Sequence, residues 1–245
     1  MSSELVSAGA AADGVSRHEP AGRTEIVDFE PLIDRLIIHF TGDAWRAEVA
    51  TAKKEFFQDA GIMDERMDHF EMRMTQFLDW YMFTRRLAGR LVTPAQYALE
   101  IDDFAMTSHE RVFFECLSET RHGLFEYLRL RGTDIAVRDL FIDKEVIIRE
   151  SQVNIGFTRE EVFDARLIPY GDDFIFARAF CFHPAEATTF IRSEIEKIQE
   201  VEDEKESHEA FESLLLRLMK MRYKYEQFRH LKLEYIYTNE KKVRF

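Results

Sequence analysis

Apolar side chains in the first half of the chain recur with the spacing of amphipathic helices. In residues 28–40 they follow a period close to 3.6, and similar stripes come after it. These further stretches are residues 43–60, 64–86, 94–104 and 107–117. Thr93 precedes a proline, which is typical of a helix start, and Thr107 with Glu110 has the spacing of a capping box. We therefore predict a helical layer of roughly five helices over residues 26–121.

The pattern changes between residues 123 and 183, where the period falls toward two and β-branched and aromatic residues become frequent. This segment predicts five strands. Their ranges are residues 124–130, 134–139, 145–149, 162–168 and 174–182. Residues 131–134 and 170–173 have the composition of turns. Five short strands in so short a segment are typical of a small, strongly bent antiparallel sheet or barrel.

The end of the chain predicts helices of contrasting charge. Pro184 opens the first of them. Residues 194–212 carry nine acidic and two basic side chains, a net charge of −7, whereas residues 217–245 carry nine basic and three acidic ones, a net charge of +6. Apolar positions in the basic stretch keep helical spacing. We expect this basic C-terminal helix to pair antiparallel with the acidic stretch, and a phosphate-rich partner is the alternative.

Together these segments predict an α+β fold, with a helical N-terminal layer, the small five-stranded β-unit and C-terminal helices. The division is residues 1–25, 26–121, 122–183 and 184–245. The first of these is rich in Ala, Ser and Gly and buries too little apolar area to offset its ordering entropy, so we expect a disordered tail. Because so small a β-unit is marginal alone, we expect one cooperative body from residue 26 onward.

Composition narrows the classes of function. The 245 residues include 33 Lys and Arg and 46 Asp and Glu, which gives a net charge of −13. That balance disfavours nonspecific binding to nucleic acid and to anionic membranes. The chain has only two cysteines, and it shows neither a secretory signal nor an apolar run of about 18 residues. We therefore expect a cytoplasmic protein that does not enter a membrane.

Motifs for metals and nucleotides are weak. Glu119 and His122 form a Glu-x-x-His pair, but the second pair that a di-iron bundle requires is missing. The sequence holds no His-Glu-x-x-His, no Cys-x-x-Cys and no glycine cluster that could surround a phosphate. We therefore expect no metal and no cofactor.

Candidate site residues lie mainly in the β-unit. Cys181 and His183 are two apart on a predicted strand and face the same side, so they could form a Cys–His pair, with His122 as a third member. The alternative is that Cys181 belongs to the core and His183 caps the following helix. The β-unit also carries arginines that could share a face with Tyr127 or Phe176 and bind nucleic acid, although a mixed-charge solvated face is the preferred interpretation. Three of these arginines are Arg129, Arg166 and Arg178, and Arg131 is the fourth.

Four stretches resemble a poorly characterised bacterial family, some members of which carry a Cys-rich zinc-binding tail of the SecC type. They are FLDWY at 77–81, TPAQYALE at 93–100, VRDLFIDKE at 137–145 and ARLIPYG at 165–171. The resemblance covers about residues 65–180 and implies an intracellular bacterial protein, without an activity. This chain lacks the Cys-rich tail, so zinc is not carried over.

The function that the sequence favours is a non-enzymatic, cytoplasmic interaction or scaffolding protein. Its partner would be another protein or a second copy, bound through the Phe- and Met-rich helices. A nucleic-acid-associated protein using the β-unit arginines or the basic C-terminal helix is one alternative. An enzyme with a site near Cys181 and His183 is the other.

Overall fold

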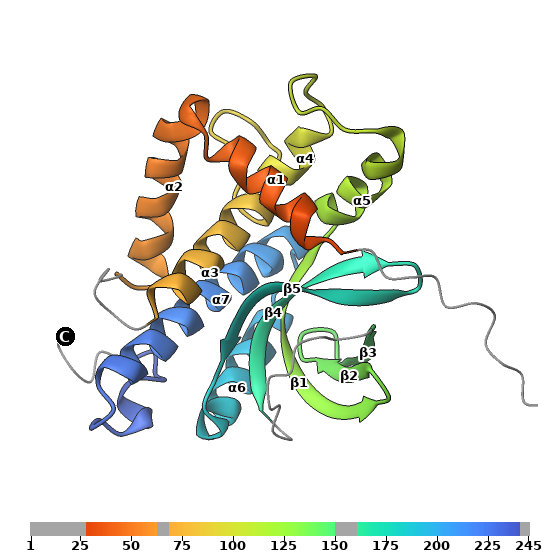
Figure 1. Ribbon diagram of the computed structural model, residues 1–245. Helices are drawn as coiled ribbons and strands as arrows, with labels where there is room; N and C mark the ends of the chain where they lie inside the picture. The colour runs from red at the N-terminus through yellow and green to blue at the C-terminus, as the bar shows by residue number, and fades with distance from the viewer. Residues whose placement is uncertain (1–27, 63–68, 150–160, 241–245) are drawn as a thin grey trace, which may run out of the picture.

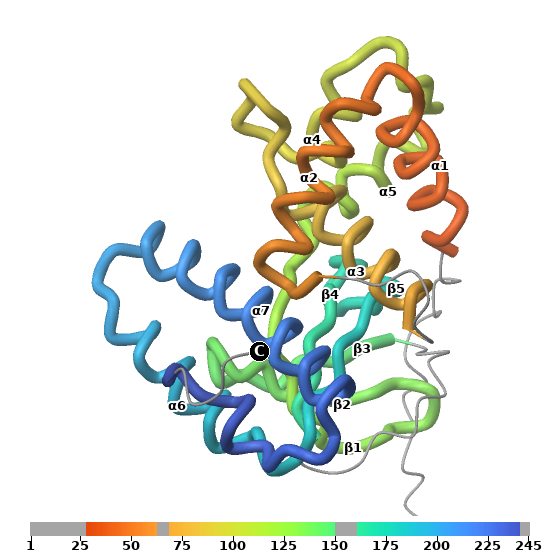
Figure 2. Tube along the Cα trace, turned by 90° about the vertical axis from the view of Figure 1, so that its left-hand side faces the viewer, coloured from red at the N-terminus to blue at the C-terminus, as the bar shows by residue number. Residues whose placement is uncertain are grey.

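The computed structural model describes residues 28–62, 69–149 and 161–240. Helices α1 to α5 gather at one end of the molecule, above a five-stranded sheet, and α6 and α7 lie along a side of that sheet (Figures 1 and 2). The predicted α+β class is confirmed. Within the described residues, no helix is long and apolar enough to cross a membrane.

The helical layer forms where the apolar stripes predict it. Its helices are α1 (Glu30–Phe40), α2 (Arg46–Asp59), α3 (Phe70–Phe83), α4 (Pro94–Ala98) and α5 (Ser108–Ser118), with the short 3₁₀ helix η1 (Asp43–Trp45) before α2. The predicted helix start at Thr93 and the predicted capping box at Thr107 with Glu110 are present, and Thr93 also forms a capping box, with Gln96. The start predicted for α3 lies partly outside the described residues. Helix α4 ends at Ala98, earlier than predicted, because Leu99 and Glu100 close a tighter turn with i→i+3 hydrogen bonds.

The β-unit is a mixed sheet. Its strands are β1 (Arg121–Arg131), β2 (Asp134–Asp139), β3 (Lys144–Ile148), β4 (Val162–Tyr170) and β5 (Asp173–Phe182). The pairing order is β1-β2-β3-β5-β4, and β4 pairs again with β1. Four of these pairings are antiparallel, as predicted, whereas β3 meets β5 in parallel through one residue pair, Ile148 with Phe174. The strand pairing therefore closes on itself, but because the seam between β3 and β5 is so thin, we describe a strongly curved mixed sheet and not a clear barrel.

The C-terminal helices do not form the predicted antiparallel pair of one acidic and one basic helix. The elements are η2 (Ala185–Ala187), α6 (Thr188–Gln199), α7 (Glu204–Gln227) and η3 (Leu233–Tyr235). Helix α7 contains the end of the acidic stretch and the start of the basic one, so the two stretches are not separate antiparallel helices. One contact of the expected kind exists, because Arg217 of α7 donates to Glu194 of α6 over 2.5 Å. The two helices pack on each other.

Aromatic side chains fill the space between these layers. Phe40, Phe56, Phe77 and Phe114 are fully buried in the helical layer. A second cluster on the inner face of the sheet centres on Phe163. On the outer face, β5 packs against α3 and α7, and β4 packs against α5. This outer face carries the polar side chains described next.

A polar cleft backed by buried carboxylates

A polar cleft of about 410 Å³ lies between the α3–α4 connection, the start of β1, the β2–β3 turn and the first part of α7. This volume is within the range of small-molecule sites. Its lining mixes cationic, acidic, hydroxyl and apolar groups. The guanidinium and imidazole side chains are Arg86, Arg121, His122, Arg166 and His208, the carboxylates are Asp139 and Glu212, the hydroxyl side chains are Thr84, Thr93, Ser118 and Thr120, and the apolar ones include Phe83, Phe141 and Ile142.

Arg166 is held at the back of the cleft by a buried ion pair. Its side chain is 2% exposed, and its Nε donates to Asp79 Oδ2 of α3 over 2.7 Å. Its Nη2 donates to Thr84 Oγ1 over 2.7 Å, and its guanidinium lies over the Phe83 ring. Alternation along β4 directs Arg166 to the outer face of the sheet, where α3 packs. The guanidinium therefore has a fixed orientation beside the cleft.

His122 of β1 has a similar partner. Its Nε2 lies 2.6 Å from Asp164 Oδ1, and the two side chains are 9% and 2% exposed. His122 is paired in register with Arg166 on β4, and Asp164 is two residues before Arg166, so all three share one face of the sheet. A buried carboxylate bonded to one ring nitrogen fixes the orientation of an imidazole.

Arg121 contacts a carboxylate and an aromatic ring. Its Nη2 lies 3.3 Å from Asp139 Oδ2, and its guanidinium stands over the Phe174 ring. Asp139 is itself held by the backbone N–H groups of Phe141 and Ile142. Within the described residues, Nε and Nη2 of Arg121 are buried and make no hydrogen bond, although Nη2 stays within ion-pair distance of Asp139. Among these residues, Nε is therefore the group of Arg121 that lacks a partner.

Two of these three pairs have a common order in space, whereas Asp139, the partner of Arg121, lines the cleft itself. His122 and Arg166 line the cleft, whereas their partners Asp164 and Asp79 do not. The cleft therefore presents the donors of Arg166 and His122, whose carboxylate partners are buried behind, beside Arg121 and the carboxylates Asp139 and Glu212. In a water-poor site, such donors interact more strongly with an anion than they would in bulk water.

The structure does not join Cys181 and His183 into a catalytic pair. Burial raises the pKa of the Cys181 thiol well above its usual range. Burial, together with the charge of Arg222, lowers the pKa of His183 to about 3. His183 Nδ1 lies 3.1 Å from Tyr237 Oη, and no hydrogen bond joins it to Cys181 in the described part of the chain. His183 also does not cap a helix, since α6 has no side-chain cap. Cys181 belongs to the core, as the alternative interpretation predicted.

The three arginines do not share one face. Arg129 pairs with Glu145 on β3. Arg178 pairs with two carboxylates of α1, with N–O distances of 2.5 Å to Glu30 and 2.8 Å to Asp34. Arg166 is turned toward α3. The candidates His122 and Arg166 are thus brought together at the cleft, whereas Arg129, Arg178, Cys181 and His183 lie elsewhere.

Sequence reasoning missed Arg121, Asp79 and Asp164. A usable signal was the presence of charged residues in apolar runs, since Asp79 follows Phe77 and Leu78, and Asp164 follows Val162 and Phe163. Buried charges are paired, so each of them implied a partner. Among the described residues, no group of three or more His, Cys, Asp and Glu side chains is placed to hold a metal ion.

The fold and the cleft define an α+β protein with a polar, arginine-containing cleft at the junction of its helices and sheet. The chain belongs to a family of unknown function, DUF7986, whose family model matches residues 48–224. This match confirms that the chain is a member of a poorly characterised family, and it contains every residue that lines the cleft. No curated protein and no solved structure matches the chain.

Proposed function

We propose that this protein binds a small anionic ligand, carrying a phosphate or carboxylate group, in the polar cleft. The observation that carries the proposal is the placement of His122 and Arg166 at the cleft with their partners Asp164 and Asp79 buried behind them, beside Arg121, whose partner Asp139 lines the cleft. Burying a charge pair costs desolvation energy that its attraction rarely exceeds. Two such pairs at one cleft are therefore better explained by a ligand than by stability.

Arg121 is the residue that would hold the anion. A guanidinium presents its N–H groups in a planar fork that matches two oxygens of a phosphate or carboxylate. Thr120 and Ser118 add hydroxyl groups to the same wall, and Phe141 and Ile142 add apolar surface. The ligand would thus have an anionic head and a partly apolar body.

The test is calorimetric titration with inorganic phosphate, pyrophosphate and citrate, using wild type and Arg121→Gln. We expect at least one of these anions to bind wild type, and Arg121→Gln to weaken that binding at least tenfold because the planar fork is lost. Arg131→Gln is the matched control, because Arg131 is an exposed arginine at the other end of β1. Failure of all three anions to bind wild type, or equal binding by Arg121→Gln, would overturn the proposal.

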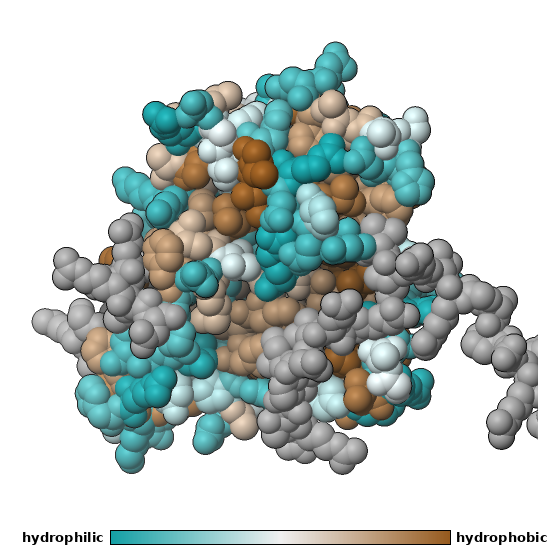
Figure 3. Space-filling view, viewed as in Figure 1, coloured by the Kyte–Doolittle hydropathy of each residue, from teal (hydrophilic) through white to brown (hydrophobic). Residues whose placement is uncertain are grey.

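A second candidate function is protein interaction, including self-association. Ile38 of α1 is 72% exposed and Met72 of α3 is 41% exposed. Figure 3 shows hydrophobic residues over these two helices on one face of the molecule. Exposed apolar surface of this kind supports a partner, and static light scattering over a concentration series would test for a second copy. A strict monomer at high concentration would exclude self-association.

The other two hypotheses have weaker support. Nucleic-acid binding through the β-unit would need arginines that are available, yet Arg129, Arg149 and Arg178 are held in ion pairs with carboxylates. Catalysis at Cys181 would need a thiolate, which burial disfavours. We retain the proposal of a bacterial cytoplasmic protein, supported by two cysteines that are both free thiols.

A further inference from the structure

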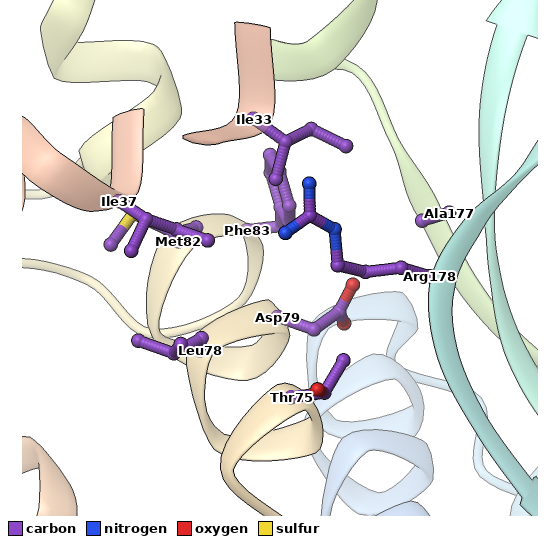
Figure 4. Close-up of a pocket in the computed structure, with 9 residues that line it drawn as sticks. All are labelled: Ile33, Ile37, Thr75, Leu78, Asp79, Met82, Phe83, Ala177 and Arg178. Atoms are coloured by element: carbon purple, nitrogen blue, oxygen red, sulfur yellow. The ribbon is translucent and has the colours of Figure 1, made fainter. Parts of the chain in front are cut away.

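A second, smaller hollow lies on the other side of Asp79. It has a volume of about 30 Å³ and opens between α1, α3 and β5. Its walls are mainly apolar, with Ile33 and Ile37 from α1 and Leu78 and Met82 from α3 (Figure 4). Arg178 of β5 and Asp79 supply its charged groups.

Asp79 has an unused acceptor at this hollow. The residue is 6% exposed, and its Oδ2 is bonded to Arg166, whereas its Oδ1 is buried without a hydrogen-bond partner in the described part of the chain. Figure 4 shows the Asp79 carboxylate pointing toward the Arg178 side chain. A buried acceptor without a partner costs free energy, so this position calls for a donor.

Arg178 has a buried donor without a hydrogen-bond partner at the same hollow, as far as the described residues show. Its Nη1 and Nη2 are engaged with Asp34 and Glu30 of the α1 end, whereas its Nε is buried and has no hydrogen-bond partner among the described residues. The formal charges are already matched, since Arg166 compensates Asp79 and the α1 carboxylates compensate Arg178. A cation would be repelled by the guanidinium and an anion by Asp79.

From these groups we infer that the hollow receives a primary carboxamide, the side chain of an asparagine or glutamine on a protein partner. A carboxamide is neutral and carries both donors and an acceptor, which matches the two unused groups. The hollow is far below the usual size of a site for a whole small molecule. The remainder of the occupant therefore lies outside the hollow, and the exposed Ile38 of α1 and Met72 of α3, on two of the elements that wall it, favour an apolar protein segment.

The experiment uses the full chain labelled with ¹³C at the methionine ε-methyl groups. Met82 lines the hollow and reports occupancy, and Met82→Leu assigns its signal. The probes are three peptides, acetyl-Leu-Gln-Leu-N-methylamide and the same peptide with Glu or Lys in the centre. We expect the Gln peptide to shift the Met82 signal with a dissociation constant at least tenfold lower than either charged peptide. No shift with any peptide means that water alone fills the hollow, and equal shifts mean that it does not select a carboxamide, so either result overturns the inference.

A variant can supply the carboxamide from within the chain. Thr75 lines the hollow one helical turn before Asp79, so Thr75→Gln places its amide on the same face of α3. We expect this variant to lose the Gln-peptide shift at least tenfold. Thr51→Gln on α2 is the matched control, because Thr51 and Thr75 both donate to the carbonyl four residues earlier. If Thr75→Gln does not fold, the comparison of the three peptides on the wild-type protein still tests whether the hollow selects a carboxamide.

Discussion

At the scale of single residues, the unusual feature is the number of charges buried at one junction. Asp79, Asp164, Arg166 and Glu194 are all buried, although such residues are rarely buried unless paired. Each has a partner across a tertiary contact, with Asp79 reaching β4 from α3 and Glu194 reaching α7 from α6. These pairs fix how neighbouring elements are oriented, because loss of one partner leaves an uncompensated charge.

Removing one member of the Asp79–Arg166 pair should be strongly destabilising. We expect Arg166→Met to lower the free energy of unfolding by about 3–5 kcal/mol, since it leaves Asp79 buried and uncompensated. The double variant Asp79→Leu with Arg166→Met should lose much less than the sum of the two single variants. Urea unfolding measures all three, and additive losses would contradict the coupling.

The residue scale is also where the sequence was least informative about the site. His122 and Arg166 were candidates and do line the cleft, but Arg121 was not, and the partners Asp79 and Asp164 were missed. The pairing of Arg166 with Asp79 spans 87 positions of the chain. Local periodicity indicates which face of a strand a side chain occupies, but not which helix covers that face.

At the scale of elements, the sequence predicted helix starts and caps correctly where the interactions that stabilise them join residues close in the chain. The capping boxes at Thr93 and Thr107 depend on residues three positions apart, and both were predictable. The parallel contact of β3 with β5 was not, because it joins strands that are distant in the sequence. Helix α7 was predicted as two oppositely charged segments, yet it is continuous because apolar spacing, and not charge, determines the helix.

The cap of α5 offers an element-scale prediction. Thr107 Oγ1 accepts from Glu110 N, and Glu110 accepts from Thr107 N in return. We expect Thr107→Ala to lower the free energy of unfolding by about 1 kcal/mol, and Thr107→Ser to retain most of it. Chemical denaturation of both variants checks this. An alanine variant as stable as wild type would show that the cap contributes nothing.

At the scale of the whole molecule, the C-terminal segment after α7 is tied back to the sheet and to α6. Tyr237 bonds to His183 at the end of β5, and Asn239 donates to Glu194 over 2.9 Å. Burial acts to raise the pKa of Glu194, but hydrogen bonds from Lys197 and Asn239 and the charge of Arg217 outweigh it and lower that pKa. Glu194 of the acidic stretch is thus compensated by Arg217 of the basic one and bonded to Asn239 beyond α7.

His183 should make the whole molecule sensitive to acid. Its pKa is lowered to about 3 in the folded state, against an ordinary value of 6.5, so the unfolded state binds the proton first. Stability should therefore fall as the pH drops from 6.5 toward 3, by up to about 1.4 kcal/mol per pH unit. His183→Asn removes this titration, and urea unfolding at pH 7 and pH 5 should show a loss about 2 kcal/mol smaller than for wild type. Equal losses would contradict a neutral, buried His183.

The two oxygens of Asp79 face different neighbourhoods, one toward Arg166 and the cleft, the other toward the hollow beneath α1. A donor placed on Oδ1 withdraws electron density from the whole carboxylate and weakens its hold on Arg166. Arg166 then has more of its charge available to an anion in the cleft. The two proposed sites would thus be thermodynamically linked through one side chain, and whatever factor a ligand in one applies to the affinity of the other, the second would return to the first.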